Sequence, residues 1–203
     1  LLKKISNLTP DIPIVSEESS KNKNNNNLKD FWLIDPIDGT SSYINNKDEF
    51  TINAALIINK KPAAGIINAP EKGRLFYSYG HTNSFEIVNN KEIKLYNNEK
   101  SKKEITAVTY SNELKPEILK YHKKFNVTKY KKMKSSLKFC VIAASEFDLY
   151  IADARASEWD IAAGHAILEH SGGTLTDFNE NEILYGKPNF KNPSLILKGK
   201  NLQ

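Results

Sequence analysis

Short apolar runs, separated by Gly, Pro and Asn-Lys breaks, follow one another through the first half of the chain. Runs of this length bounded by turn-forming residues are typical of β-strands, and short breaks between them favour antiparallel neighbours. The pattern therefore predicts a largely antiparallel sheet. Its strands are expected at residues 12–16, 31–35, 50–58, 63–69, 74–79 and 84–88.

The second half of the chain mixes helical and strand-like patterns. Its clearest helix is residues 158–171, where small and apolar residues recur at three- and four-residue intervals. A Gly-Gly pair directly after it provides the stop. The other predicted elements are helices over 112–124 and 136–145 and extended segments over 127–133 and 147–152.

A charged, Asn-rich stretch at residues 89–104 separates the two patterns and is the predicted internal boundary. We expect an α+β half over residues 1–104 and an α/β half over residues 105–203, which together give an α/β (α+β) layered fold. The polar, low-complexity residues 21–30 predict a mobile surface loop. The opening residues are typical of the tail of a helix, so we expect an N-terminal segment to precede Leu1.

Composition narrows the class of protein. Cys140 is the only cysteine, which excludes an internal disulfide and a cysteine-based zinc site and favours a reducing compartment. The net charge of +5 comes from scattered lysines with one cluster at residues 129–134, so we favour a basic, soluble surface over nucleic-acid binding. No apolar run approaches the length of about 20 residues that crosses a bilayer. We expect a cytoplasmic protein, with peripheral association with the inner membrane as the alternative.

Two acids, Asp35 and Asp38, follow the apolar run at 31–35 in the sequence Asp-Pro-Ile-Asp-Gly-Thr. One interpretation is an ordinary type I turn that Gly39 closes. The other is a site for metal and phosphate, because a carboxylate at a strand end needs a positive partner. Residues 39–42 then offer small side chains and backbone N–H groups at the start of a helix. With oxygen ligands and no His or Cys nearby, Mg²⁺ fits such a site better than zinc.

Further acids for such a site would come from two other places in the sequence. Glu17 and Glu18 end the run at 12–16, and the alternative for either is an exposed acidic loop. Asp160 stands three residues after Ser157, where it also fits a capping box at the start of the clearest helix. The residues alone leave these alternatives open.

Three segments together resemble the inositol-monophosphatase-like superfamily of Mg²⁺-dependent, Li⁺-sensitive phosphatases. They are SEES, WLIDPIDGTSSYI and SEWDIAAGHAILEHSGG. The chain is more similar to the bacterial 3′(2′),5′-bisphosphate nucleotidase branch than to the inositol branch, through DEFTINAALI, GIINAP, SSLKFC, WDIAAGHA and YGKPNFKNP. The resemblance runs from about Pro13 to the C-terminus. It implies a sugar-phosphatase-like αβαβα arrangement with an antiparallel N-terminal sheet and a mixed C-terminal sheet.

The resemblance also implies a chemistry. It implies a hydrolase with two or three Mg²⁺ ions that removes a phosphate from a small phosphorylated nucleotide, adenosine 3′,5′-bisphosphate, in sulfur metabolism. The alternatives are an inositol-phosphate phosphatase and a catalytically dead nucleotide- or nucleic-acid-binding relative. We expect a monomer or a homodimer, with no nucleic acid as a partner.

Individual roles follow from the same resemblance. The implied metal ligands are Glu17, Asp35, the backbone carbonyl of Ile37, Asp38 and Asp160. The implied catalytic residues are Glu17, Asp35, Asp38 and Thr40, with Thr40 orienting the attacking water. The residues expected to contact the substrate around the scissile phosphate are Glu17, Ile37, Asp38, Gly39, Thr40 and Asp160.

Weaker signals concern the rest of the substrate. Ser135, Ser136 and Lys138 precede a helix and are candidates for binding a ribose hydroxyl or a second phosphate. Their alternative is a helix N-cap and a solvated lysine. Arg155 would pair with a phosphate or face water.

Four other residues have a structural interpretation beside a functional one. Tyr43 and Tyr185 are candidates for stacking on adenine, with packing in the core or at the rim favoured. His165 is expected to be a core or surface histidine, and Cys140 a small buried apolar residue.

Three departures from the family pattern accompany the resemblance. The family usually has an earlier Thr-x-x-Asp-like segment, whose Asp partners the threonine that matches Thr40, and no counterpart stands before Glu17. We therefore expect either missing upstream residues or an inactive relative. Ser41-Ser42-Tyr43 replaces Lys-Glu-Phe, and DARASEWD stands where the branch often has Gly-Pro-Thr before Trp-Asp, which leaves the substrate contacts there open.

Overall fold

The computed structural model describes residues 1–18, 28–96 and 104–202. Most of the predicted mobile loop at 21–30 lies outside the described residues. The chain begins with helix α1 (Leu2–Leu8), as the helical pattern of the opening residues predicts.

The first sheet is largely antiparallel, which confirms the prediction from the apolar runs. Among the described residues its strands follow the order of the sequence, and β1 is parallel to β2 whereas every later pair is antiparallel. The strands are β1 (Ile14–Ser16), β2 (Phe31–Asp38), β3 (Thr51–Ile58), β4 (Lys61–Ala69), β5 (Arg74–Ser78), β6 (Ser84–Val88) and β7 (Lys91–Lys94).

The last of these strands, β7, lies inside the stretch 89–104 that the sequence pattern treats as a boundary. Asn89 and Asn90 adopt φ values of 51° and 58°, so they form a tight turn that joins β6 to β7 as a hairpin. Asn tolerates this left-handed conformation better than most residues, which explains why two asparagines stand there.

The second sheet is mixed. Its order is β11-β12-β10-β8-β9, with β8 parallel to β9 and β10, and β12 antiparallel to β10 and β11. The strands are β8 (Ile105–Thr109), β9 (Val127–Lys132), β10 (Leu149–Ala152), β11 (Thr174–Thr176) and β12 (Leu195–Lys198).

The helices match the predicted positions with one shifted start. Helix α3 begins at Pro116 rather than at residue 112, because Lys115 is extended and proline favours the first helical position. The other helices are α2 (Thr40–Ile44), α4 (Leu137–Ala143) and α5 (Glu158–His170), with 3₁₀ turns at Pro70–Lys72, Pro188–Phe190 and Lys200–Leu202.

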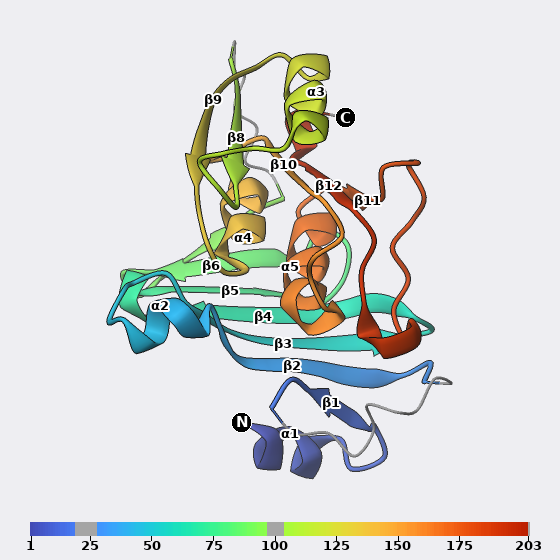
Figure 1. The fold of residues 1–203 in the computed structure, drawn as a ribbon. Helices are drawn as coiled ribbons and strands as arrows, with labels where there is room; N and C mark the ends of the chain where they lie inside the picture. The colour runs from blue at the N-terminus through green and yellow to red at the C-terminus, as the bar shows by residue number, and fades with distance from the viewer. Residues whose placement is uncertain (19–27, 97–103, 203) are drawn as a thin grey trace.

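The elements form five layers, which confirms the αβαβα arrangement. Figure 1 shows α1 beneath the first sheet, α4 and α5 between the two sheets, and α3 beyond the second. Helix α5 lies very close to β4 at Gly65, which has no side chain. A Cβ on Gly65 would lie only 2.4 Å from the carbonyl oxygen of Ala163 in α5. This close packing holds the start of α5, where Asp160 stands, against the first sheet.

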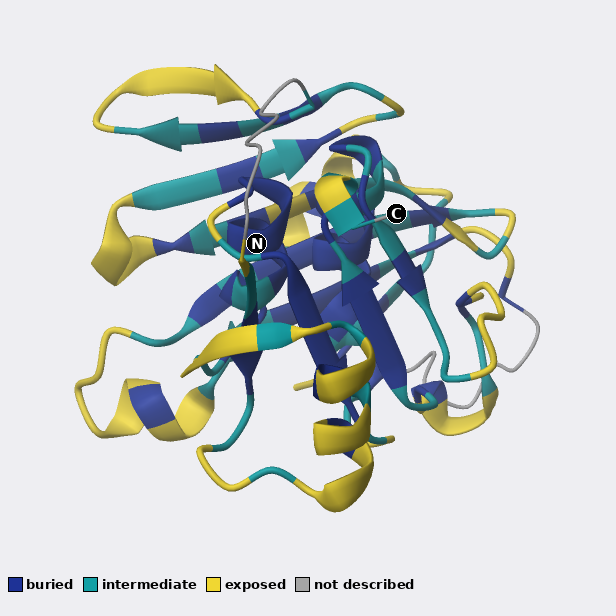
Figure 2. Ribbon diagram, turned by 90° about the horizontal axis from the view of Figure 1, so that it is seen from above, coloured by how far each residue is buried: buried dark blue, intermediate teal, exposed yellow. Residues whose placement is uncertain are grey.

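Buried residues gather in the central strands and helices, and exposed residues lie at the rim (Figure 2). The largest buried apolar cluster joins Phe31 and Phe76 of the first sheet to Tyr150 and Leu197 of the second. The division of the chain at residue 104 stays a prediction. Among the residues that the structure describes, no helix is both long and apolar enough to cross a membrane.

Candidate metal centre and substrate cavity

Three carboxylates from separate parts of the chain converge. Oxygens of Glu17, Asp35 and Asp160 all lie within 4.8 Å of one another. The parallel pairing of β1 with β2 brings Glu17 beside Asp35, since the Glu17 N–H donates to the carbonyl of Ile34 at 3.2 Å. The start of α5, packed on the same sheet, supplies Asp160.

Two of these carboxylates, Asp35 and Asp160, are held in conditions that disfavour their negative charges. Burial, followed by the charges of Asp38, Glu17 and Asp160, raises the pKa of Asp35 to about 9. Burial and the nearby Asp38 likewise raise the pKa of Asp160 to about 6. A divalent cation would reverse this effect, and a set of carboxylate oxygens is the donor set that Mg²⁺ prefers. The residues present therefore fit the metal that the resemblance implies.

The position of Asp160 is compatible with both of the roles that the sequence leaves open. Its Oδ2 accepts a hydrogen bond from the Ser157 N–H at 2.7 Å, which completes the capping box of α5. A second carboxylate oxygen remains for the cluster, because a carboxylate can accept on both oxygens. The capping interpretation and the site interpretation are thus compatible.

The turn at the end of β2 is built by its own side chains. Asp35 Oδ1 accepts a hydrogen bond from the Ile37 N–H at 3.0 Å, and the Thr40 hydroxyl donates to the Ile37 carbonyl at 3.1 Å. Gly39 has a φ of 89°, and a Cβ there would lie 2.7 Å from the carbonyl oxygen of Glu49. Only glycine fits this position, and α2 starts directly after it.

Asp38 lies next to this group of three, and hydrogen bonds hold its carboxylate. Its Oδ2 accepts from the Ser136 hydroxyl at 2.6 Å, from the Ser136 N–H, and from the Thr51 hydroxyl at 3.3 Å. The Ser136 hydroxyl also lies 2.5 Å from the main-chain oxygen of Asp160. Ser136 therefore links Asp38 to the first turn of α5.

A cavity of about 280 Å³ adjoins these acids. Asp38 and Asp160 form part of its wall, and the cations Lys134, Lys138 and Arg155 form another part. The remaining lining residues are Tyr110, Met133, Ser135, Phe139, Tyr150, Ala152, Ala156, Ile161 and Leu195. A ligand in this cavity would contact the acids, or metal ions bound to them, on one side and three basic side chains on the other.

Two of the three weaker substrate candidates, Ser135 and Lys138, line this cavity. Burial lowers the pKa of Lys138, and its ammonium donates to the carbonyl of Ser135. Lys138 is therefore half-buried in the cavity wall, neither fully solvated nor fully enclosed. Ser135 is buried, and its hydroxyl accepts a weak hydrogen bond from the Leu137 N–H at 3.4 Å. Their contacts with a substrate stay a prediction.

The inositol monophosphatase family model matches residues 1–201 of this chain. The chain belongs to the inositol monophosphatase family. Among curated relatives, the 3′(2′),5′-bisphosphate nucleotidase CysQ of Buchnera aphidicola subsp. Acyrthosiphon pisum is 38% identical over 198 residues, covering 94% of this chain and 72% of that protein. CysQ of Salmonella typhimurium is 32% identical over 196 residues, covering 95% of this chain and 78% of that protein.

A solved structure agrees with these relatives. CysQ from Bacteroides thetaiotaomicron, a bacterial member of the inositol monophosphatase family, matches with a TM-score of 0.85 and 29% identity. The match covers 97% of this chain and 80% of that one. The family and the resemblance to its CysQ branch are thus confirmed.

The two aromatic candidates for stacking on adenine, Tyr43 and Tyr185, do not line the cavity beside the acids. Tyr185 is 1% exposed, and its hydroxyl lies 2.9 Å from Nδ1 of the buried His165, which confirms the favoured interpretation of Tyr185 as a core residue. Tyr43 is half exposed and packs edge-on against Phe50, with 5.1 Å between ring centroids. Cys140 is fully buried, as expected.

Residues that the sequence did not single out for these roles complete the site. Tyr110 lines the cavity beneath Arg155, and Asn53 Nδ2 donates to the Ser136 hydroxyl at 3.1 Å. The sequence singled out Ser136 only as a candidate substrate contact, because nothing local links it to Asp38, which lies 98 residues away. Such contacts depend on the tertiary fold.

Proposed function

We propose that this chain is a Mg²⁺-dependent 3′(2′),5′-bisphosphate nucleotidase that converts adenosine 3′,5′-bisphosphate to AMP and phosphate. The observation that carries the proposal is the position of the carboxylate cluster beside a cavity with three basic residues. A phosphomonoester with a second anionic group would place one phosphate at the acids and their metals, and the other near these cations. The CysQ relatives support the same substrate class.

The residues that would hold the metal are Glu17, Asp35 and Asp160, with Asp38 and the Ile37 carbonyl beside them. Two or three ions are part of the proposal. Bound Mg²⁺ supplies Lewis acidity, which lowers the pKa of water and neutralises charge on phosphoryl oxygens. The carboxylates hold this charge in place before the substrate arrives, so little reorganisation accompanies the reaction.

Thr40 is placed to orient the attacking water. Its hydroxyl proton is committed to the Ile37 carbonyl, so the lone pairs of Oγ1 remain to accept a hydrogen bond from the attacking water. The water oxygen attacks phosphorus in line and the ester P–O bond breaks. Of the two water protons, one stays on the released phosphate and the other goes to the departing nucleoside oxygen. Gly39 leaves the backbone of the turn free of a side chain where the phosphate would approach.

The test is phosphate release by the full-length protein. With Mg²⁺ we expect turnover of adenosine 3′,5′-bisphosphate with a kcat/KM well above that for inositol 1-phosphate, and loss of turnover in EDTA. A preference for inositol 1-phosphate would assign the protein to the other branch of the family. No turnover of either substrate would contradict the proposal.

A cytoplasmic location completes the proposal. Its support is the single cysteine, Cys140, which is buried and is a free thiol rather than part of a disulfide. Fractionation of cells that express the protein would test it, and recovery with the membrane fraction would contradict it.

A further inference from the structure

The buried hydroxyl of Ser136 lies where three elements meet. It contacts Asp38 at the end of β2, the Asn53 amide of β3 and the main-chain oxygen of Asp160 in α5. Ser136 and Asn53 are each only 1% exposed. One hydroxyl therefore connects two of the acids of the candidate site.

The contacts of Ser136 leave Asp38 with one open oxygen. Oδ2 of Asp38 accepts hydrogen bonds from the Ser136 N–H, the Ser136 hydroxyl and the Thr51 hydroxyl. A carboxylate oxygen offers about two lone-pair positions, so Oδ2 is filled. Oδ1 of Asp38 remains available to a cation. The hydrogen bonds to Oδ2 fix the orientation of the carboxylate and therefore the direction in which Oδ1 points.

Asn53 determines how the Ser136 hydroxyl is used. Its Nδ2 donates to Ser136 Oγ at 3.1 Å and occupies a lone pair, so the single hydroxyl proton must go to Asp38 or to the Asp160 carbonyl. An ionised carboxylate is the stronger acceptor of the two. Asn53 Oδ1 is buried without a hydrogen-bond partner among the described residues, so the hydrogen bond to Ser136 is the contact that holds the Asn53 amide in place.

We propose that Ser136, oriented by Asn53, is a positioning residue that directs Asp38 and the first turn of α5, with Asp160, towards the divalent cation. This inference rests on the proposed function. Removal of the hydroxyl loosens two carboxylates at once and weakens metal binding. A higher Mg²⁺ concentration compensates for this loss.

The test is calorimetric titration of the full-length protein with Mg²⁺, without substrate. Groups that orient metal ligands typically contribute about 10- to 100-fold in affinity, so we expect Ser136→Ala to raise the Mg²⁺ dissociation constant by a factor in that range. Asn53→Ala should raise it by a smaller factor, because the Ser136 hydroxyl remains. Raising Mg²⁺ to saturation should restore most of the activity that both variants lose at low Mg²⁺.

Ser84→Ala is the matched control. The Ser84 hydroxyl is fully buried and donates to the Ile167 carbonyl of α5 at 3.0 Å, without contact to an acid of the site. Its loss should lower the melting temperature much as Ser136→Ala does, with no change in the Mg²⁺ dissociation constant.

Each outcome has a distinct meaning. Wild-type affinity in Ser136→Ala overturns the inference, and so does an equal loss of affinity in Ser84→Ala, which would show a general effect of stability. If Ser136→Ala does not fold, Asn53→Ala decides, and an unchanged dissociation constant there overturns the inference. Absence of Mg²⁺ binding in the wild-type protein overturns the proposed function instead.

Discussion

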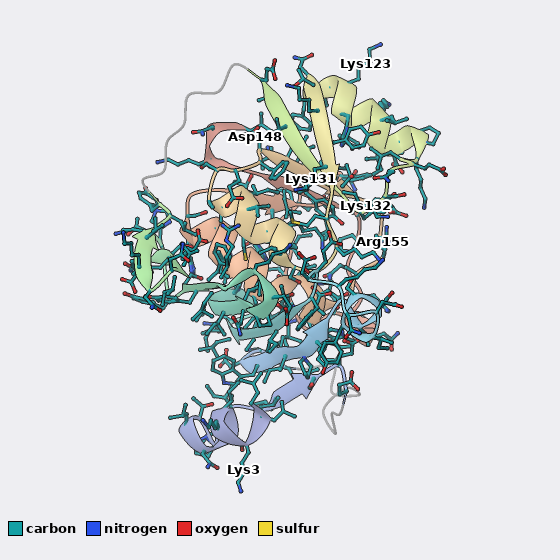
Figure 3. The ribbon with its side chains drawn as sticks, turned by 90° about the vertical axis from the view of Figure 1, so that its left-hand side faces the viewer. Lys3, Lys123, Lys131, Lys132, Asp148 and Arg155 are labelled. Atoms are coloured by element: carbon teal, nitrogen blue, oxygen red, sulfur yellow. The ribbon has the colours of Figure 1, made fainter. Side chains whose placement is uncertain are left out.

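The guanidinium carbon of Arg155 lies 4.0 Å from the centroid of the Tyr110 ring, and both side chains line the cavity beside Asp38 and Asp160. Arg155 forms no ion pair with any residue that the structure describes, so its N–H groups remain available to a ligand. Figure 3 shows it on the segment that leads into α5, with Lys131 and Lys132 of β9 in the same part of the view. Of the two interpretations of Arg155, contact with a phosphate is the one that this geometry favours.

Arg155→Ala is therefore expected to reduce kcat/KM for adenosine 3′,5′-bisphosphate by about 10- to 100-fold, the range that corresponds to loss of a hydrogen bond to a charged group. The change should lie in KM, because Arg155 would contact the phosphate that is not cleaved. Hydrolysis of inositol 1-phosphate should be unaffected. Tyr110→Phe keeps the ring under Arg155 and serves as the control, with kinetics near wild type.

Equal losses with both substrates would contradict this role. They would indicate that Arg155 supports the cavity wall rather than one phosphate of the substrate.

Replacement of Asp35 should separate metal binding from folding. Asp35→Asn keeps the shape of a buried side chain, and burial and the neighbouring acids already disfavour a negative charge at this position, so the melting temperature of the metal-free protein should not fall. The rise in melting temperature that Mg²⁺ gives the wild type should disappear, together with phosphate release. Differential scanning calorimetry with and without Mg²⁺ measures both effects, and an active Asp35→Asn enzyme would refute the assignment.

Local chemistry made the metal motifs predictable. The Asp35–Gly39 turn carries its own signature, since the acids, the proline and the glycine all lie within five residues. The spacing of Asp160 from Ser157 predicted a capping box, which the structure confirms, whereas the role of Asp160 as a metal ligand was implied by the family resemblance and stays a prediction. Apolar runs of five or more residues predicted the long strands, because this signal too lies within a few consecutive residues.

Tertiary contacts set the limit of that prediction. Strands β11 and β12 are three and four residues long, too short for a pattern of alternation to appear. The aromatic ring of Tyr185 is of the kind that stacks on a nucleobase, yet the fold buries this ring against His165. The contact between Ser136 and Asp38 has no counterpart in local sequence, because it forms only when α4 meets the end of β2.

Gly39→Ala is expected to damage both stability and activity. The substitution combines a φ of 89° with a Cβ 2.7 Å from the Glu49 carbonyl, so we expect a loss of about 2–3 kcal/mol and a melting temperature lower by about 4–12 °C. Phosphate release should fall sharply, since the turn also places Asp38 and Thr40. Gly73→Ala is the matched control.

At Gly73 the φ is 59° and nothing lies within 4 Å of an added Cβ. This variant should therefore lose only about 1 kcal/mol from backbone strain and keep full activity. If the two alanine variants behave alike, close contact at Gly39 has no special importance for the site.

The most direct measurement of the central claim is an anomalous difference map from crystals of the full-length protein grown with Mn²⁺ as a substitute for Mg²⁺. Convergence of Glu17, Asp35 and Asp160 predicts a strong peak coordinated by oxygens of all three carboxylates. A Mn²⁺-activated enzyme whose map shows no peak between these three side chains would contradict the claim.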